Sequence, residues 1–184
     1  MRLIVADTSA MISEFNPTTD MQIERILDGF SIATNQQPTG TGEAGQIQVE
    51  FGAAVNGSSD PVQLLADGTL RINQAGTYRI KVSFVFGRTG GGGTSKLRFR
   101  ALINGVQAGN SVGGDVPNSN SENPYADEAW LTVPAGLDIT YEVMRDSSGS
   151  DAGGLFQPEI TAGTAPSWNP APCAAIRVER WIKA

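Results

Sequence analysis

Residues 75–86 read Ala-Gly-Thr-Tyr-Arg-Ile-Lys-Val-Ser-Phe-Val-Phe, and this stretch decides the fold class. From Tyr78 to Phe86 every second residue is apolar, and the residues between them are polar or basic as far as Ser83. Successive side chains of a strand point to opposite faces of its sheet, so the stretch predicts a strand with one face in a core. The other face has to accommodate positive charge.

Further stretches with the same alternation follow, and turn signals separate them. Asp67-Gly68 and Asn104-Gly105 are hairpin signals, and the 184 residues include 22 glycines and 10 prolines. Seven to nine short strands with long connections are typical of a two-sheet sandwich. Strands are expected near residues 47–51, 70–72, 75–86, 96–103, 129–133, 137–143 and 176–181. Long loops are expected at 109–123 and 146–172, with a short strand near 159–161 in the second loop.

The first 45 residues differ in pattern from the rest and predict an N-terminal arm. Thr19 and Gln22 have the spacing of a capping box, and apolar residues follow at mostly helical spacing. We therefore expect a short helix over residues 20–28, ended by Gly29, and a linker at residues 35–42. The predicted architecture is all-β, with a partly helical arm (residues 1–45) and a β-sandwich (residues 46–184).

Charge is distributed unevenly along a chain whose net charge is −6. Seven basic residues and no acidic residue lie between Asp67 and Asp115. If the strands near residues 77–86 and 96–103 were neighbours, like charges would gather on one face, which destabilises a sheet. Either Asp138 and Glu142 on another strand neutralise them, or an acidic surface of a sister subunit or another protein covers them. Nucleic acid is disfavoured because stacking aromatics are missing from this face. The predicted assembly charge patch consists of Arg79, Lys81, Lys96, Arg98 and Arg100.

The chain has no histidine, which removes the commonest general base and metal ligand. The string at residues 109–113 matches G-x-S-x-G, but Ser111 has no histidine to activate it. We therefore expect no catalytic residues, no enzyme activity and no cofactor. Asp146 and Asp151 are weak candidates for a metal site in an acidic Ser/Gly loop. Cys173 is the only cysteine, so no intrachain disulfide is expected, and no apolar run is long enough to span a membrane.

Two strings carry a resemblance to a known superfamily. The Ala-Gly-Thr-Tyr turn at residues 75–78 leads into a long apolar strand, and a charged strand then ends in Asn-Gly at residues 104–105. This order, with the turn and strand at residues 133–143, resembles jelly-roll domains of the complement globular-head and tumour necrosis factor type. The resemblance covers roughly residues 46–182. It implies a jelly-roll β-sandwich and a homotrimer, and similar modules occur in tailed-phage virion proteins.

The function that follows from this resemblance is a virion structural role. We expect a capsid decoration or cement protein that binds the outside of a phage head, stabilises it, and is made in the host bacterial cytoplasm. Its partners would be its own copies and the major capsid protein or another virion protein, with no membrane and no nucleic acid. The expected partner-binding residues are the apolar residues of the arm: Leu3, Ile4, Val5, Met11, Ile12, Phe15, Ile23, Ile26, Leu27 and Phe30.

An alternative is a fibre or tail tip that binds a receptor or a carbohydrate. Recognition would then lie in the long loops at residues 109–123 and 146–172. Tyr125 and Trp168 would be the platforms for sugar rings.

Overall fold

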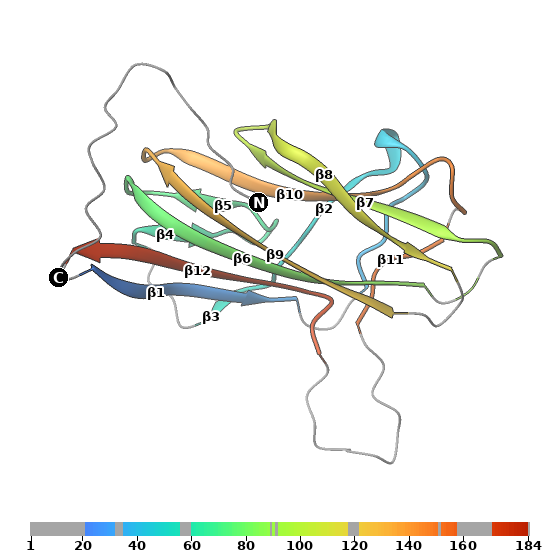
Figure 1. The fold of residues 1–184 in the computed structure, drawn as a ribbon, viewed down its shortest axis with the longest axis horizontal. Coiled ribbons are helices and arrows are strands. Elements are labelled where there is room, and N and C mark those ends of the chain that lie inside the picture. The colour runs from blue at the N-terminus through green and yellow to red at the C-terminus, as the bar shows by residue number, and fades with distance from the viewer. Residues whose placement is uncertain are drawn as a thin grey trace, which may run out of the picture.

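A computed structural model shows two stacked antiparallel sheets, which confirms the all-β sandwich (Figure 1). It describes residues 21–31, 35–55, 60–88, 90, 92–117, 122–150, 152–157 and 171–183. Each sheet has six strands among these residues, and one short 3-10 helix, η1 (Glu43–Gly45), lies between strands. In the described part of the chain no helix is long and apolar enough to cross a membrane.

Sheet A has the strand order β9-β6-β12-β1-β3, and β11 also pairs with β6. The alternating stretch at residues 75–86 belongs to β6, which lies between β9 and β12. The last strand of the described chain, β12, therefore lies inside the sheet, between β6 and β1. The strands are β1 (Met21–Phe30), β3 (Ala54–Val55), β6 (Gly76–Gly87), β9 (Glu122–Val133), β11 (Gly154–Leu155) and β12 (Ala174–Lys183).

Sheet B has the order β4-β5-β10-β7-β8, and β2 also pairs with β10. Its two long central strands, β7 and β10, pair over seven positions from Leu97 opposite Arg145 to Ile103 opposite Ile139. The strands are β2 (Ile47–Gln48), β4 (Val62–Leu64), β5 (Leu70–Ile72), β7 (Ser95–Ile103), β8 (Val106–Val116) and β10 (Leu137–Arg145).

The core lies between the two sheets and has an aromatic centre. Phe84 of β6 packs against Phe99 of β7 with ring centroids 4.6 Å apart. Tyr141 of β10 stacks on Phe99 at 5.6 Å and meets the edge of Phe51 at the same distance. All four side chains are at most 5% exposed. The alternation expected for residues 78–86 is therefore confirmed, because each apolar residue of that series except Val85 is buried.

The predicted helix at residues 20–28 is wrong, because the described part of it belongs to β1. This strand pairs along its length with β12, from Met21 opposite Lys183 to Phe30 opposite Ala175. A bulge between Arg25 and Leu27 turns two adjacent apolar residues, Ile26 and Leu27, into the core. The expected boundary at residue 45 therefore does not separate β1 from the sandwich, and the described residues 35–45 also contact it, with Gln36 bridging to Leu155.

The first predicted long loop is mostly strand. Residues 109–116 continue β8, and β9 begins at Glu122, seven residues before the expected start. Both strands are rich in small and polar residues, so no apolar alternation marks them. In the second expected loop, β11 pairs with β6, and the strand expected near residues 159–161 lies outside the described residues.

Candidate assembly surface

The outer face of sheet A collects one group of the predicted site residues. The register places Arg79 of β6 between Trp130 of β9 and Glu179 of β12, and Lys81 between Glu128 and Arg177. These side chains alternate with the buried ones, so all of them point away from the core. We define the outer face of sheet A as Ile23, Asp28, Phe30, Val55, Arg79, Lys81, Glu128, Trp130, Arg177, Glu179 and Trp181.

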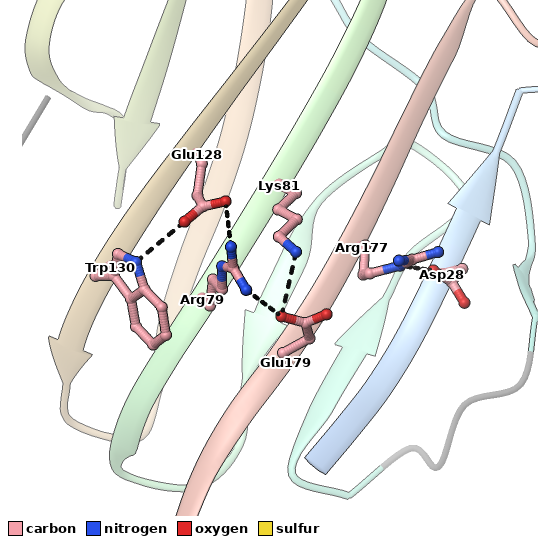
Figure 2. A network of polar contacts seen from close by, with 7 residues as sticks. All are labelled: Asp28, Arg79, Lys81, Glu128, Trp130, Arg177 and Glu179. Carbon is pink, nitrogen blue, oxygen red and sulfur yellow. Dashed lines mark hydrogen bonds and ion pairs between the residues drawn. The ribbon is translucent and has the colours of Figure 1, made fainter. Parts of the chain in front are cut away.

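An ion-pair network crosses the middle of this face (Figure 2). The Arg79 guanidinium donates to the Glu128 carboxylate at 2.7 Å and to Glu179 at 3.3 Å. The Lys81 ammonium lies 3.5 Å from the same Glu179 carboxylate. The Glu128 carboxylate also accepts a hydrogen bond from the Trp130 indole at 3.1 Å. Diagonal neighbours on three strands are thus joined, so the charges on this face neutralise one another.

A second ion pair links β12 to β1 and contains a buried carboxylate. Asp28 is only 1% exposed although it lies on the outer side of the sheet. The Arg177 guanidinium, directly opposite it, donates at 2.9 Å, and Arg25 also pairs with it. Burial of a carboxylate is costly unless it is paired and hydrogen-bonded, and these two guanidinium groups meet both conditions. They are about half exposed, at 42% and 48%, and so cover the carboxylate from the solvent side.

Apolar side chains lie at both ends of the network. At one end Trp130 meets Trp181 edge-to-face at 5.0 Å, and Ile23 lies directly opposite Trp181 on β1. At the other end are Phe30 and Val55, of β1 and β3. Ile23, Phe30, Val55 and Trp130 are 52%, 36%, 45% and 37% exposed. Of the five large apolar side chains found exposed in the described part of the chain, four therefore lie on this one face.

Between the two ends the surface is hollowed into a shallow groove of about 620 Å³. Phe30 and Trp130 contribute apolar walls, and Asp28, Lys81 and Arg177 contribute paired charges. The groove has the size of a pocket for a small molecule, but it is open to the surface and not enclosed. A protruding element of another protein surface would fit this shape.

The electrostatics of the network favour a fixed, fully charged arrangement. The hydrogen bond from Arg79 lowers the pKa of Glu128, and the same bond raises the pKa of Arg79. The hydrogen bond to Asp28 likewise raises the pKa of Arg177. Every carboxylate of the network is held by a cation, so the arrangement is suited to fixing a rigid surface and not to moving protons.

The predicted assembly charge patch does not form a single surface. Arg79 and Lys81 lie on β6 in sheet A, whereas the other three cations lie on β7 in sheet B. The two strands are not neighbours, so this part of the expectation is wrong. The sequence could not reveal this, because alternation identifies a face of a strand but not the sheet to which the strand belongs.

On sheet B the predicted neutralisation is confirmed for Glu142, whereas Asp138 pairs with Arg71 of β5, which is not one of the five cations of the predicted patch. Arg100 donates to Glu142 at 2.7 Å, and Arg71 makes a two-pronged contact with Asp138 at 2.9 Å. Arg98 lies 3.4 Å from Asp146, and the Lys96 ammonium reaches the hydroxyl of Ser148 at 3.4 Å.

The predicted partner-binding residues divide into three groups. Ile23 and Phe30 are exposed on the outer face of sheet A. Ile26 and Leu27 are 4% and 1% exposed, so their assignment to partner binding is corrected: they are core residues. The remaining six, Leu3, Ile4, Val5, Met11, Ile12 and Phe15, lie outside the described residues.

Sequence reasoning missed Val55, Trp130 and Trp181 as members of this face. Trp130 alternates with the buried Leu131 and Val133, which is a signal that could have shown it pointing outward. The weak metal candidate Asp146 accepts two hydrogen bonds from Ser148 and faces Arg98, and Asp151 lies outside the described residues.

The two expected sugar platforms are not brought together. Tyr125 lies on the inner side of β9, where its ring packs 6.0 Å from Phe86 and from Phe99. It is therefore not an exposed platform. Trp168 lies outside the described residues.

Comparison with known proteins finds similar folds among solved structures but no similar sequence. No protein-family model matches the chain, and no curated protein matches its sequence. Similar solved structures include murine APRIL at pH 5.0, with a TM-score of 0.51 and 12% identity over 85% of this chain and 98% of that one. Others are Eiger TNF from S. frugiperda (TM-score 0.45, 14% identity, covering 88% and 95%) and the globular domain of the zebrafish complement 1qA protein (0.44, 12%, 88% and 99%). The likeness to APRIL concerns the fold alone and agrees with the two-sheet jelly-roll sandwich seen here.

Proposed function

We propose that this jelly roll is a self-associating structural subunit, and that the outer face of sheet A is its contact with other copies. The observation that carries the proposal is the concentration of Ile23, Phe30, Val55 and Trp130 on one face. Exposed apolar patches rimmed by polar residues mark interaction sites, and this face has one such group at each end of the ion-pair network. Aromatic residues are enriched in the centres of interfaces.

The paired charges on this face support the same proposal. An unpaired charge is costly to bury at an interface, whereas Arg79, Lys81 and Arg177 already have carboxylate partners within their own chain. A second copy can therefore cover them without supplying a counter-charge. The apolar side chains at the two ends of this face would be buried in the contact, and the ion-pair network between them would remain intact. Three copies is the number that the sequence resemblance implies.

The test compares matched charge insertions by sedimentation velocity. Phe30→Asp and Ile23→Asp place a carboxylate on the proposed contact, and Val106→Asp places one on a 71% exposed apolar residue of β8 in sheet B. We expect the wild type and Val106→Asp to sediment as the same oligomer and the two sheet A variants to sediment as single chains. An oligomer that survives Phe30→Asp and Ile23→Asp would contradict the proposal.

Within this proposal the assembly serves as a decoration protein on the outside of a phage head. The support is in the sequence: Leu3, Ile4, Val5 and Met11 are among the apolar residues that precede β1, and the described sandwich has a well-filled core without them. Such an arm would bury its apolar residues where shell subunits meet. Binding that is linked to the closed shell stabilises it by mass action.

Co-sedimentation with the cognate empty capsid tests this role. A chain that lacks residues 1–20 keeps all of β1, so it should remain folded and oligomeric yet fail to bind the capsid. Circular dichroism and sedimentation of the shortened chain provide the control. Capsid binding that persists without residues 1–20 would contradict the proposed role of the arm. It would not affect the self-association proposal, which sedimentation velocity tests separately.

A further inference from the structure

The sandwich has an open side where β8 of sheet B lies next to β9 of sheet A. Within the described residues β8 pairs only with β7, and β9 pairs only with β6, so no ladder closes this side. A crevice of about 60 Å³ enters the core between the two strands. A single water needs about 10–15 Å³ in the same measure, so the crevice holds a chain of about four or five non-hydrogen atoms.

The crevice is lined mostly by apolar side chains, and several of them are small. Its lining includes Ile80, Ile103 and Ile139, together with Ala108 of β8 and Ala129 of β9. Larger side chains at the two alanines would fill the space. The local sequence therefore leaves the core accessible at this place, and an unbranched aliphatic chain fits what remains.

Polar groups occur at one end of this apolar space. Asp127 occupies an inward position of β9, between the inward-facing Tyr125 and Ala129, and lines the crevice with Asn110. One Asp127 oxygen accepts the Glu128 backbone N–H at 2.8 Å. In the part of the chain that the structure describes, no basic side chain forms an ion pair with this carboxylate, although carboxylates on both outer sheet faces have such partners.

The Asp127 carboxylate affects the ionisation of the tyrosines in and beside the crevice. Tyr141, 5% exposed, also lines it, and burial raises the pKa of this phenol far above its ordinary value. The nearby negative charge of Asp127 raises it further, and burial, the same charge and a hydrogen bond to the Asp127 carboxylate together raise the pKa of Tyr125. A negative potential therefore extends into an apolar space, which favours a cation with an aliphatic body.

An inward-pointing charge on an edge strand also protects against edge-to-edge aggregation. That role would explain a carboxylate at residue 127 by itself. It does not explain the small residues Ala108 and Ala129, which keep the crevice open beside the charge. Charge and shape together favour an occupant of matching chemistry.

We propose that this crevice binds a short primary alkylammonium ion, with its alkyl chain against Ile80, Ile103 and Ile139 and its ammonium group at Asp127 and Asn110. The crevice shares Asp127 and Glu128 with the groove on the outer face of sheet A, but its other lining residues belong to the interior and to β8. The ammonium would donate to the Asp127 carboxylate, and a charge-assisted hydrogen bond of this kind is about twice as strong as a neutral one. We expect an affinity of about 1 mM, which is weaker than the ceiling for a ligand of about five non-hydrogen atoms.

The experiment titrates the full-length protein with n-butylammonium and with n-butanol, at constant ionic strength and pH 7, and follows backbone amide signals by NMR. We expect both probes to shift the signals of residues that line the crevice, and the ammonium to bind about tenfold more tightly. Equal affinities for the two probes, or no saturable shift with either, would overturn the proposal.

Three variants assign the effect to the site. Asp127→Asn should remove the preference for the ammonium and keep weak binding of the alcohol, because the cavity remains. Ala129→Leu should abolish binding of both probes by filling the crevice. Asp115→Asn, an exposed carboxylate on β8, is the matched control and should retain the preference. A preference that persists in Asp127→Asn, or binding that persists in Ala129→Leu, would overturn the assignment, and thermal unfolding of each variant verifies its fold.

Discussion

At the scale of single residues, Glu128 shows how the outer face of sheet A is kept in one arrangement. Its carboxylate receives Arg79 at 2.7 Å and the Trp130 indole at 3.1 Å. The Arg79 guanidinium in turn lies over the Trp130 ring at 5.2 Å from its centroid. These three contacts hold a large aromatic side chain in a defined orientation at the surface. A pre-ordered aromatic loses less conformational entropy when another protein surface covers it.

The lowered pKa of Glu128 predicts a pH dependence of stability. Its folded pKa lies below the ordinary value of 4.5, so its contribution is complete above pH 4.5 and is lost as the pH falls through the folded pKa. Because the side chain is 37% exposed, we expect Glu128→Gln to cost less than about 1 kcal/mol at pH 7. The variant should also show a shallower loss of stability between pH 5 and pH 3, by about the same energy.

Urea unfolding of the wild type and of Glu128→Gln at several pH values measures both effects. Glu24→Gln, an exposed glutamate on β1, is the control. Parallel pH profiles for the wild type and Glu128→Gln would contradict the role given to this ion pair.

Two isoleucines of β1 should respond very differently to truncation. Ile26 is 4% exposed and lies in the core, and Ile23 is 52% exposed on the outer face. We expect Ile26→Ala to lower the free energy of unfolding by about 2–5 kcal/mol, because it removes core packing and leaves a cavity. Ile23→Ala should change the stability of the single chain by about 0.5 kcal/mol or less. Denaturant unfolding at low protein concentration measures this, and equal losses would contradict the bulged register of β1.

At the scale of elements, the turn before β5 depends on a close backbone contact. Gly68 has φ of +85°, and a Cβ there would lie 1.9 Å from the Val49 carbonyl oxygen. Gly136, in the turn before β10, has nearly the same φ, +82°, but open space around it. The two positions therefore separate backbone strain from steric exclusion.

We expect Gly136→Ala to cost about 1–2 kcal/mol, the strain of a left-handed conformation alone. Gly68→Ala has to move the backbone at Val49 as well, so it should cost clearly more than Gly136→Ala. Thermal and denaturant unfolding of the two variants compare the costs. A Gly68→Ala loss no larger than that of Gly136→Ala would show that the turn can move away from Val49.

The elements that the sequence predicted correctly are those with strict alternation. β6 and β7 have apolar residues at every second position, and Asn104-Gly105 turns the chain between β7 and β8 as expected. β1 was misassigned because its bulge brings Ile26 and Leu27 to the same side, which imitates helical spacing. β8 was missed because its inward residues include Ala108 and Asn110, so that no apolar period marks the strand.

The candidate surface was only partly predictable for a related reason. Arg79 was singled out from its strand and Phe30 from the predicted N-terminal arm, and both lie on the outer face of sheet A. Their association with Trp130 depends on the pairing of β9 with β6, which joins residues about fifty positions apart. Cross-strand partners of this kind follow from topology, and alternation within one strand contains no information about it.

At the scale of the whole molecule, the two outer faces differ in what they offer a partner. On sheet B, Arg100 and Arg71 are matched by Glu142 and Asp138, and the large exposed apolar side chain among the described residues of that sheet is Val106. On sheet A the matched charges lie between apolar ends. We therefore expect apolar burial, and not charge attraction, to drive assembly.

Charge reversal and added salt distinguish these two driving forces. We expect Arg98→Glu and Arg100→Glu to leave the oligomer intact, because both residues lie on sheet B. At 1 M salt the Debye length is about 3 Å, so contacts that depend on exposed charges weaken, whereas apolar contacts remain. Sedimentation at low and high salt measures the outcome. Dissociation of the wild type at high salt would indicate assembly through charge.

The central claim is that copies of this chain meet through the outer face of sheet A, and side-chain footprinting during dilution tests it most directly. Hydroxyl-radical labelling is measured at Phe30, Trp130 and Val106 from high to low protein concentration. We expect labelling of Phe30 and Trp130 to be suppressed at high concentration and to rise together as the oligomer dissociates, while Val106, which is 71% exposed on sheet B, stays constant. Labelling of Phe30 and Trp130 that does not depend on concentration, in a protein that sediments as an oligomer, would contradict the claim.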